Sequence, residues 1–81
     1  MLIKLSKKED FIRLAKYTKA KGYDYIIVYT VFQVYLIPRV SSRHRHTYFY
    51  EGTEEDIQSI LKEVEGLTFE IYEGEVKAVT T

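Results

Sequence analysis

The chain has 81 residues and no cysteine, and its 12 basic and 12 acidic side chains give a formal net charge of zero. Without cysteine it has no disulfide bonds, no thiolate chemistry and no cysteine-ligated metal site. No apolar run is long and uncharged enough to span a membrane, and charged residues follow Leu5 where a signal peptide would be apolar. The length and the 46% apolar content predict one globular domain, residues 1–81. The lack of a signal-peptide pattern predicts that it is cytoplasmic.

The charge is unevenly distributed along the chain. Residues 1–50 contain ten Lys or Arg and three Asp or Glu, a balance of +7, whereas residues 51–81 contain two Lys and nine Asp or Glu, a balance of −7. Such asymmetry is typical of a protein with an anion-binding face. It is equally consistent with two complementary surfaces that attract each other within one fold or between protomers.

The first elements in chain order are a strand and an amphipathic helix. Residues 2–5 predict a short strand. Ser6 and Glu9 have the spacing of a capping box, so Ser6 is the predicted N-cap of the helix. The helix then covers residues 7–21 and stops at Gly22. Its apolar stripe consists of Phe11, Leu14, Ala15 and Thr18.

The next stretch, residues 23–37, is rich in β-branched and aromatic residues and has no Gly, Asn or internal Pro. We expect one long strand here, bent near Thr30 because it is at least twice the usual length of about 5–6 residues. The alternative is a hairpin at Thr30-Val31, where the residues are poor turn formers.

A two-residue turn at Ser41-Ser42 pairs this strand with another strand that ends at Gly52. The turn predicts that residues of similar polarity face each other on both faces of the hairpin. The predicted pairs are Val34 with Phe49, Leu36 with Thr47, Tyr35 with Tyr48, and Gln33 with Tyr50.

The last third of the chain predicts a second helix and one or two short strands. Thr53 is the predicted N-cap, acidic residues follow it, and Gly66 ends the helix. The apolar stripe of this helix consists of Ile57, Ile60, Leu61 and Val64. Leu67, Phe69 and Ile71 alternate with polar residues as in a half-buried strand, and residues 76–79 predict a further short strand.

The predicted order is therefore β-α-β-β-α-β with an optional extra strand at the C-terminus. Two amphipathic helices against one antiparallel sheet fit a ferredoxin-like, split βαβ sandwich. We predict this α+β fold, with a long hairpin formed by the second and third strands.

The tip of that hairpin contains the one local concentration of unusual chemistry in the sequence. Arg39, Arg43, His44, Arg45 and His46 are all basic, and no acidic residue lies among them. Arginine makes bidentate contacts with phosphates, histidine adds pH-dependent charge, and Tyr48 could stack on a base. The tip therefore favours DNA or RNA as partner. The alternative is a solvated hairpin end that protects an edge strand from aggregation.

The sequence contains two short motifs of the kind found in metal or nuclease sites. His44-Arg45-His46 places both imidazoles on one strand face and resembles the His-hydrophobic-His motif of rolling-circle replication nucleases. That resemblance implies metal binding and a nucleophilic helix tyrosine. Here Arg45 replaces the hydrophobic residue, and the helix at 54–65 has no tyrosine. Glu75-Val76-Lys77 lacks a suitable preceding Asp, so we predict no metal site and no catalytic residue.

The eight tyrosines allow a second functional interpretation. They could form a base-stacking platform on an open sheet face, as in RNA-recognition modules. The favoured reading is that they cover half-buried sheet surface or a subunit contact. The alternative function is thus a protein-interaction module, an adaptor or inhibitor, that uses the long strand or a tyrosine-rich face.

The absence of asparagine and cysteine, together with many charges, is typical of heat-stable proteins. In composition the chain resembles small orphan proteins of hyperthermophilic archaea and their viruses, although it shares no motif with them. The leading prediction is a thermostable, non-enzymatic protein that needs no cofactor, forms a homodimer and binds nucleic acid.

Overall fold

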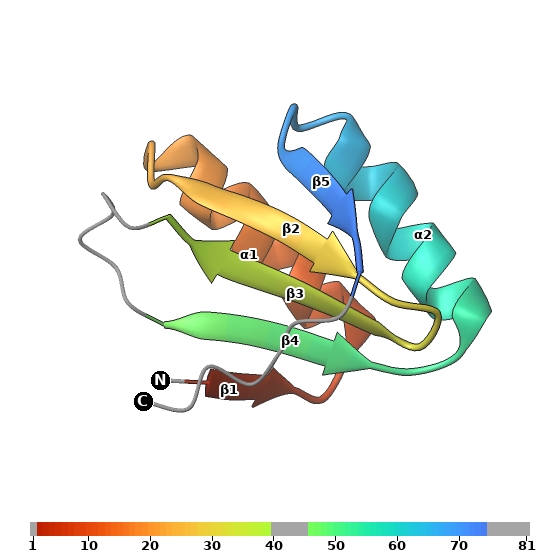
Figure 1. Ribbon diagram of the computed structural model, residues 1–81. Coiled ribbons are helices and arrows are strands. Elements are labelled where there is room, and N and C mark those ends of the chain that lie inside the picture. Colours follow the sequence, from red (N-terminus) through yellow and green to blue (C-terminus); the bar gives the residue numbers. More distant parts are fainter. Residues whose placement is uncertain (1, 40–45, 75–81) are drawn as a thin grey trace.

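The computed structural model describes residues 2–39 and 46–74. Within these residues all strands form one five-stranded sheet in the order β1-β4-β3-β2-β5 (Figure 1). The strands are β1 (Leu2–Leu5), β2 (Tyr25–Tyr29), β3 (Gln33–Pro38), β4 (Thr47–Glu51) and β5 (Glu70–Glu73), and the helices are α1 (Lys8–Ala20) and α2 (Glu54–Glu65).

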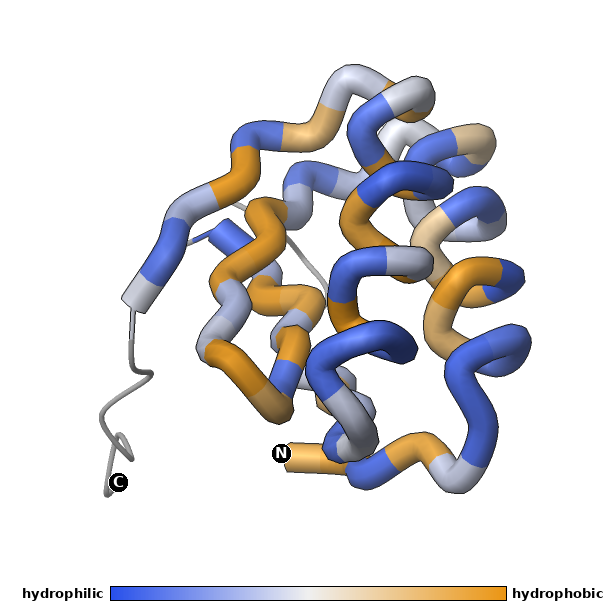
Figure 2. Tube along the Cα trace, turned by 90° about the vertical axis from the view of Figure 1, so that its right-hand side faces the viewer, coloured by the Kyte–Doolittle hydropathy of each residue, from blue (hydrophilic) through white to orange (hydrophobic). Residues whose placement is uncertain are grey.

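The sheet is mixed. Strand β3 is antiparallel to its neighbours β2 and β4, whereas the outer strands pair in parallel, β1 with β4 and β5 with β2. Helix α1 connects β1 to β2, helix α2 connects β4 to β5, and both lie on the same face of the sheet (Figures 1 and 2). The α+β class is confirmed.

The ferredoxin-like arrangement is not confirmed. A ferredoxin-like sheet is antiparallel, and one strand separates the two strands of each βαβ unit. Here β4 and β3 both lie between β1 and β2, and the outer strands pair in parallel. The difference arises because the segment predicted as one strand is folded into two.

The prediction of one long strand over residues 23–37 is wrong, and the alternative, a hairpin at Thr30-Val31, is correct except that its tip lies one residue later. The backbone N–H of Thr30 donates to the carbonyl of Gln33 at 2.8 Å, and the exposed residues Val31 and Phe32 form the tip of a tight hairpin. In β2 the buried side chains are those at odd-numbered positions, such as Ile27. In β3, after the turn, they are those at even-numbered positions, such as Leu36. Packing of both strands against the helices therefore overrides the poor turn propensity of the tip.

The predicted register between β3 and β4 is wrong by one residue. Val34 pairs with Tyr50, Tyr35 with Phe49, and Leu36 with Tyr48. A shift of one residue exchanges the two faces of a strand. Tyr48 and Tyr50 consequently face the helices, and Phe49 faces away from them. The predicted turn at Ser41-Ser42 lies outside the described residues, as does the predicted strand at 76–79.

The core lies between the sheet and the helices, where Figure 2 shows the hydrophobic positions gathered between the two layers. Both predicted apolar stripes face it, and the strands contribute their helix-facing side chains. The buried apolar residues are Phe11, Ala15, Tyr25, Ile27, Val34, Leu36, Ile57, Ile60, Val64 and Phe69.

Three of the four predicted helix ends are confirmed, among them Gly66, the C-cap of α2, and one is wrong. The hydroxyl of Thr53 accepts from the backbone N–H of Asp56, and the Asp56 carboxylate completes the capping box. Gly22 follows α1 with φ +77°, the left-handed conformation that glycine adopts without strain. Ser6 is not the N-cap of α1: Lys7 occupies that position and makes no side-chain capping bond. The capping box predicted with Ser6 is therefore absent.

Candidate nucleic-acid interface

One end of the sheet brings together basic residues that are far apart in the sequence. We call it the amino end, because β1, β2, β4 and β5 begin there and β3 ends there. The C-terminus of α1 lies at this end too, since it leads into β2 (Figure 1). Lys19, Lys21, Arg39 and His46 therefore belong to one region of the molecule.

The structure describes part of the predicted basic tip. Arg39, His46 and Tyr48 lie within the described residues. Arg43, His44 and Arg45 lie outside them, so their predicted role stays a prediction from sequence. Arg39 and His46 themselves lie at the amino end.

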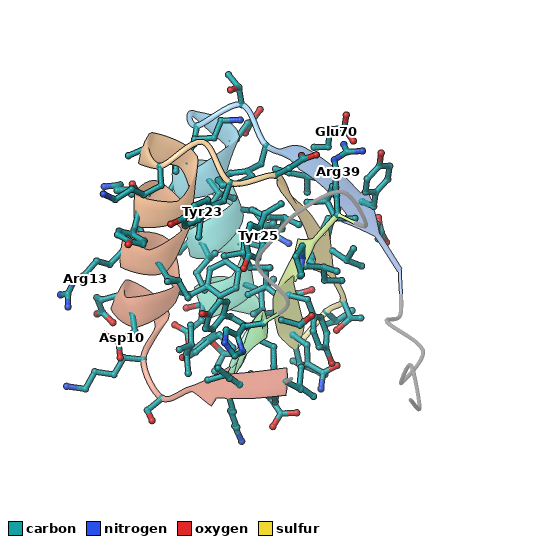
Figure 3. The ribbon with its side chains drawn as sticks, turned by 90° about the vertical axis from the view of Figure 1, so that its left-hand side faces the viewer. Asp10, Arg13, Tyr23, Tyr25, Arg39 and Glu70 are labelled. Atoms are coloured by element: carbon teal, nitrogen blue, oxygen red, sulfur yellow. The ribbon has the colours of Figure 1, made fainter. Side chains whose placement is uncertain are left out.

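Arg39 is bound within the protein. Its Nε lies 3.0 Å from Asp24 Oδ1, and its terminal nitrogen donates to Glu70 Oε2. Figure 3 shows Arg39 and Glu70 side by side. Tyr72 also donates to Glu70, at 2.9 Å, and the hydrogen bonds from Tyr72 and Arg39 lower the pKa of the Glu70 carboxyl. Arg39 thus links β3 to the start of β2 and β5, and its charge is compensated by two carboxylates.

His46 and Tyr48 are held by a buried tyrosine. The hydroxyl of Tyr25 donates to the carbonyl of His46 at 3.1 Å, and the His46 ring lies 6.1 Å from the Tyr48 ring. Burial raises the pKa of Tyr25, and the neighbouring Tyr48 and Tyr23 raise it further, so the phenol remains a neutral donor. The imidazole of His46 is exposed, whereas Tyr48 is half-buried. Of these two predicted residues, His46 is the more available to a ligand.

The aromatic contacts continue from this point onto helix α1. Tyr23 meets Tyr17 edge to face, with their ring centres 6.3 Å apart. The Lys21 ammonium lies 5.8 Å from the Tyr17 ring centre, within the range of a cation–π interaction. Tyr17, Tyr23, Tyr25 and Tyr48 form the tyrosine row, which leads from Lys21 to His46.

Tyr17, Tyr23 and Lys21 were not predicted as site residues. The sequence did contain a signal, because lysines cluster at the end of the first helix. The helix dipole alone explains that cluster, so it did not point to a ligand. Their proximity to His46 became evident only from the fold.

The lysines of α1 differ in how firmly they are held. Lys19 lies 5.0 Å from the Phe69 ring centre and donates to the Thr68 carbonyl at 3.4 Å. Lys16 and Lys21 are exposed and make no ion pair with any of the described residues. These two are therefore the least constrained lysines of the second half of α1 and its C-cap.

Other candidate sites have structural explanations or lie outside the described residues. In residues 2–39 and 46–74, no cluster of three His, Asp or Glu side chains could hold a metal ion. Glu54, Glu55 and Asp56 occupy the first turn of α2, where negative charge suits the helix dipole. No helix of the described chain has the length and apolar content needed to cross a bilayer.

The tyrosine platform that the sequence offered as the alternative is reduced, on the helix-free sheet face, to Tyr35 and Tyr72. Tyr25, Tyr29, Tyr48 and Tyr50 pack against the helix-side core instead. Tyr50 additionally donates to Asp56 at 3.1 Å. The tyrosine row at the amino end therefore presents one exposed ring, that of Tyr17, above half-buried and buried ones.

Comparisons with protein-family models, with curated proteins and with solved structures gave no match.

Proposed function

We propose that the protein is a small, thermostable, non-enzymatic nucleic-acid-binding protein that uses the amino end of its sheet. The observation that carries the proposal is that Lys21 and Tyr17 lie at the same end of the sheet as His46, which precedes β4, with the tyrosine row between them. Cations flanking exposed aromatic rings suit a strand of nucleic acid, because phosphates and bases alternate along it.

The residues divide into two roles in this proposal. Lys16, Lys21, Arg43 and Arg45 contact phosphates, and His46 and the exposed face of Tyr17 stack on bases. Arg39, which the sequence placed among the phosphate contacts, is instead occupied by its ion pairs with Asp24 and Glu70 and has no phosphate contact in this proposal.

A pair of variants tests this division. Arg43→Ala/Arg45→Ala removes two phosphate contacts and should weaken binding of a single-stranded oligonucleotide about 25-fold at 0.1 M salt. Arg13→Ala is the matched control, since Arg13 is an exposed arginine that pairs with Asp10 in the first half of α1, away from the amino end of the sheet, and it should leave the affinity at the wild-type value. Equal losses in both variants would refute the assignment, and no loss in the double variant would refute the proposed function.

The alternative, a protein-interaction module, is favoured by a different observation. The sheet face opposite the helices is apolar at its centre and lies away from the basic residues of α1. That face accommodates a protein partner better than it accommodates a polyanion.

A further inference from the structure

We infer that the helix-free face of the sheet binds a second copy of this chain, face to face, about a two-fold axis that runs along β3. This inference uses a surface other than the nucleic-acid interface and does not depend on it. We call the surface the open face; its apolar centre consists of Ile26 and Val28 from β2, Tyr35 and Ile37 from β3, and Phe49 from β4.

The register places these side chains next to one another. Ile26 pairs with Ile37, and Val28 with Tyr35, which in turn pairs with Phe49. The rings of Tyr35 and Phe49 stack with their centres 5.4 Å apart and their planes 19° apart. Half-buried apolar side chains from three adjacent strands therefore form one continuous patch.

Charged residues lie at the two sides of this patch. On the side of β1, Lys4 and Glu51 form an ion pair of 3.7 Å. On the side of β5, Arg39 pairs with Asp24 and Glu70. An apolar centre with a charged rim is the anatomy of a protein–protein interface.

The charges also decide between classes of partner. Both sides of the open face carry carboxylates, which repel the phosphates of nucleic acid and anionic lipid headgroups. Both sides also carry a cation, so the face can complement a copy of itself. A flat sheet packs well on another sheet at a separation of about 10 Å.

The direction of the two-fold axis follows from the outer strands. An axis along β3 places β1 of one copy over β5 of the other, where the register sets Lys4 level with Tyr72, two residues along β5 from the Glu70 carboxylate. An axis across the strands places β1 over β1, so that Lys4 faces the same lysine of the other copy. The first arrangement brings Lys4 near a carboxylate, whereas the second, with its axis at the level of Lys4, opposes like charges.

The size of the face predicts a reversible dimer. Five strands about 4.8 Å apart, with lengths of four to six residues, cover roughly 400 Å² of flat area in each copy. Because side chains project from the sheet, the accessible surface buried is larger than the flat area. It amounts to about 1,000 Å² for the two copies together, near the lower limit for specific interfaces. We therefore expect a dissociation constant in roughly the micromolar range.

Analytical ultracentrifugation of the full chain tests the dimer with two matched variants. Val28→Lys introduces a charge at the centre of the open face and should give a monomer. Val31→Lys makes the same change at the exposed tip of the β2–β3 hairpin, where Val31 is 54% exposed, and should dimerise like the wild type. Circular dichroism melting checks that each variant folds.

Cross-linking tests the axis without a charged substitution. Because the chain has no cysteine, single cysteines give unambiguous products. Sheets about 10 Å apart are beyond the reach of a disulfide, so a short bifunctional thiol reagent is required. Tyr35→Cys and Ile37→Cys both lie on the predicted axis and should each cross-link to the same residue of the other copy. Val28→Cys lies about 10 Å to the side of its counterpart and should not.

The possible results either support or overturn the inference. A dimer that Val28→Lys dissociates and Val31→Lys preserves supports it, as does cross-linking confined to the two β3 cysteines. A wild-type chain that remains monomeric at about 1 mM overturns it. Efficient cross-linking through Val28→Cys together with none through Ile37→Cys would refute the axis along β3.

Discussion

The charge of Lys21 gives the most quantitative test of the nucleic-acid interface. Lys21 is the C-cap residue of α1, its ammonium lies 5.8 Å from the Tyr17 ring centre, and it forms no ion pair with the described residues. Each phosphate neutralised on a single strand contributes about 0.7 to the slope of log affinity against log salt. Loss of one contact therefore weakens binding about fivefold at 0.1 M salt, which corresponds to roughly 1 kcal/mol.

The assay is fluorescence anisotropy of a labelled single-stranded oligonucleotide, titrated with the protein over a series of salt concentrations. Lys21→Ala should flatten the slope by about 0.7 and weaken binding at every salt concentration below 1 M. Lys62→Ala is the control, because Lys62 is exposed in the last turn of the acidic helix α2. If Lys21→Ala leaves the slope unchanged, or if Lys62→Ala flattens it equally, Lys21 makes no phosphate contact.

Three further predictions concern stability. Thr68 has φ +61°, a left-handed conformation that is more strained for a β-branched residue than for glycine. Thr68→Gly should therefore raise the unfolding free energy by about 0.5–1 kcal/mol and Tm by roughly 3–6 °C. Thr68→Ala should raise both by a smaller amount. Ile60 is fully buried, so Ile60→Ala should lower stability by about 2–5 kcal/mol in urea titrations without changing the secondary structure. Hydrogen bonds from Tyr72 and Arg39 lower the pKa of Glu70 from 4.5, so its contribution to stability is present above that pH and lost as the pH falls through the lowered value. Glu70→Gln should therefore make the acid limb of a stability–pH profile less steep, and an unchanged limb would contradict this account of Glu70.

The helices could be predicted from the sequence because their information is local. The apolar positions in both helices recur every three or four residues, and Phe11, Ile57 and Ile60 are fully buried as expected. The second cap could be predicted as well, since Thr53 and Asp56 are three residues apart. Ser6 shows the limit of such patterns: its spacing to Glu9 is suitable, but the helix begins one residue later than that cap requires.

The sheet order depends on information that is not local. Val31 and Phe32 are strongly apolar, and nothing in their immediate sequence predicts that they form an exposed hairpin tip. The turn becomes favourable because it lets Ile27 and Leu36 face the same core. Without this turn the prediction contained one strand where the structure has β2 and β3. It therefore gave the wrong sheet order and did not include the parallel pairing of the outer strands.

The candidate site was predicted in part. The basic residues around the β3–β4 connection were recognised from their density in the sequence. The partners that compensate Arg39 could not be recognised, because Asp24 and Glu70 are 15 and 31 residues away along the chain. The tyrosine row was missed for the same reason, since it combines residues from α1, β2 and β4.

The most direct test of the central claim is the salt dependence of nucleic-acid binding by the wild-type chain. The measurement is an anisotropy titration with single-stranded and duplex DNA and RNA at about 50 mM and 200 mM salt. Four phosphate contacts, from Lys16, Lys21, Arg43 and Arg45, predict single-strand binding that weakens about 50-fold between these concentrations. Absence of binding at the lower salt concentration, or an affinity that salt does not change, would contradict the proposed function.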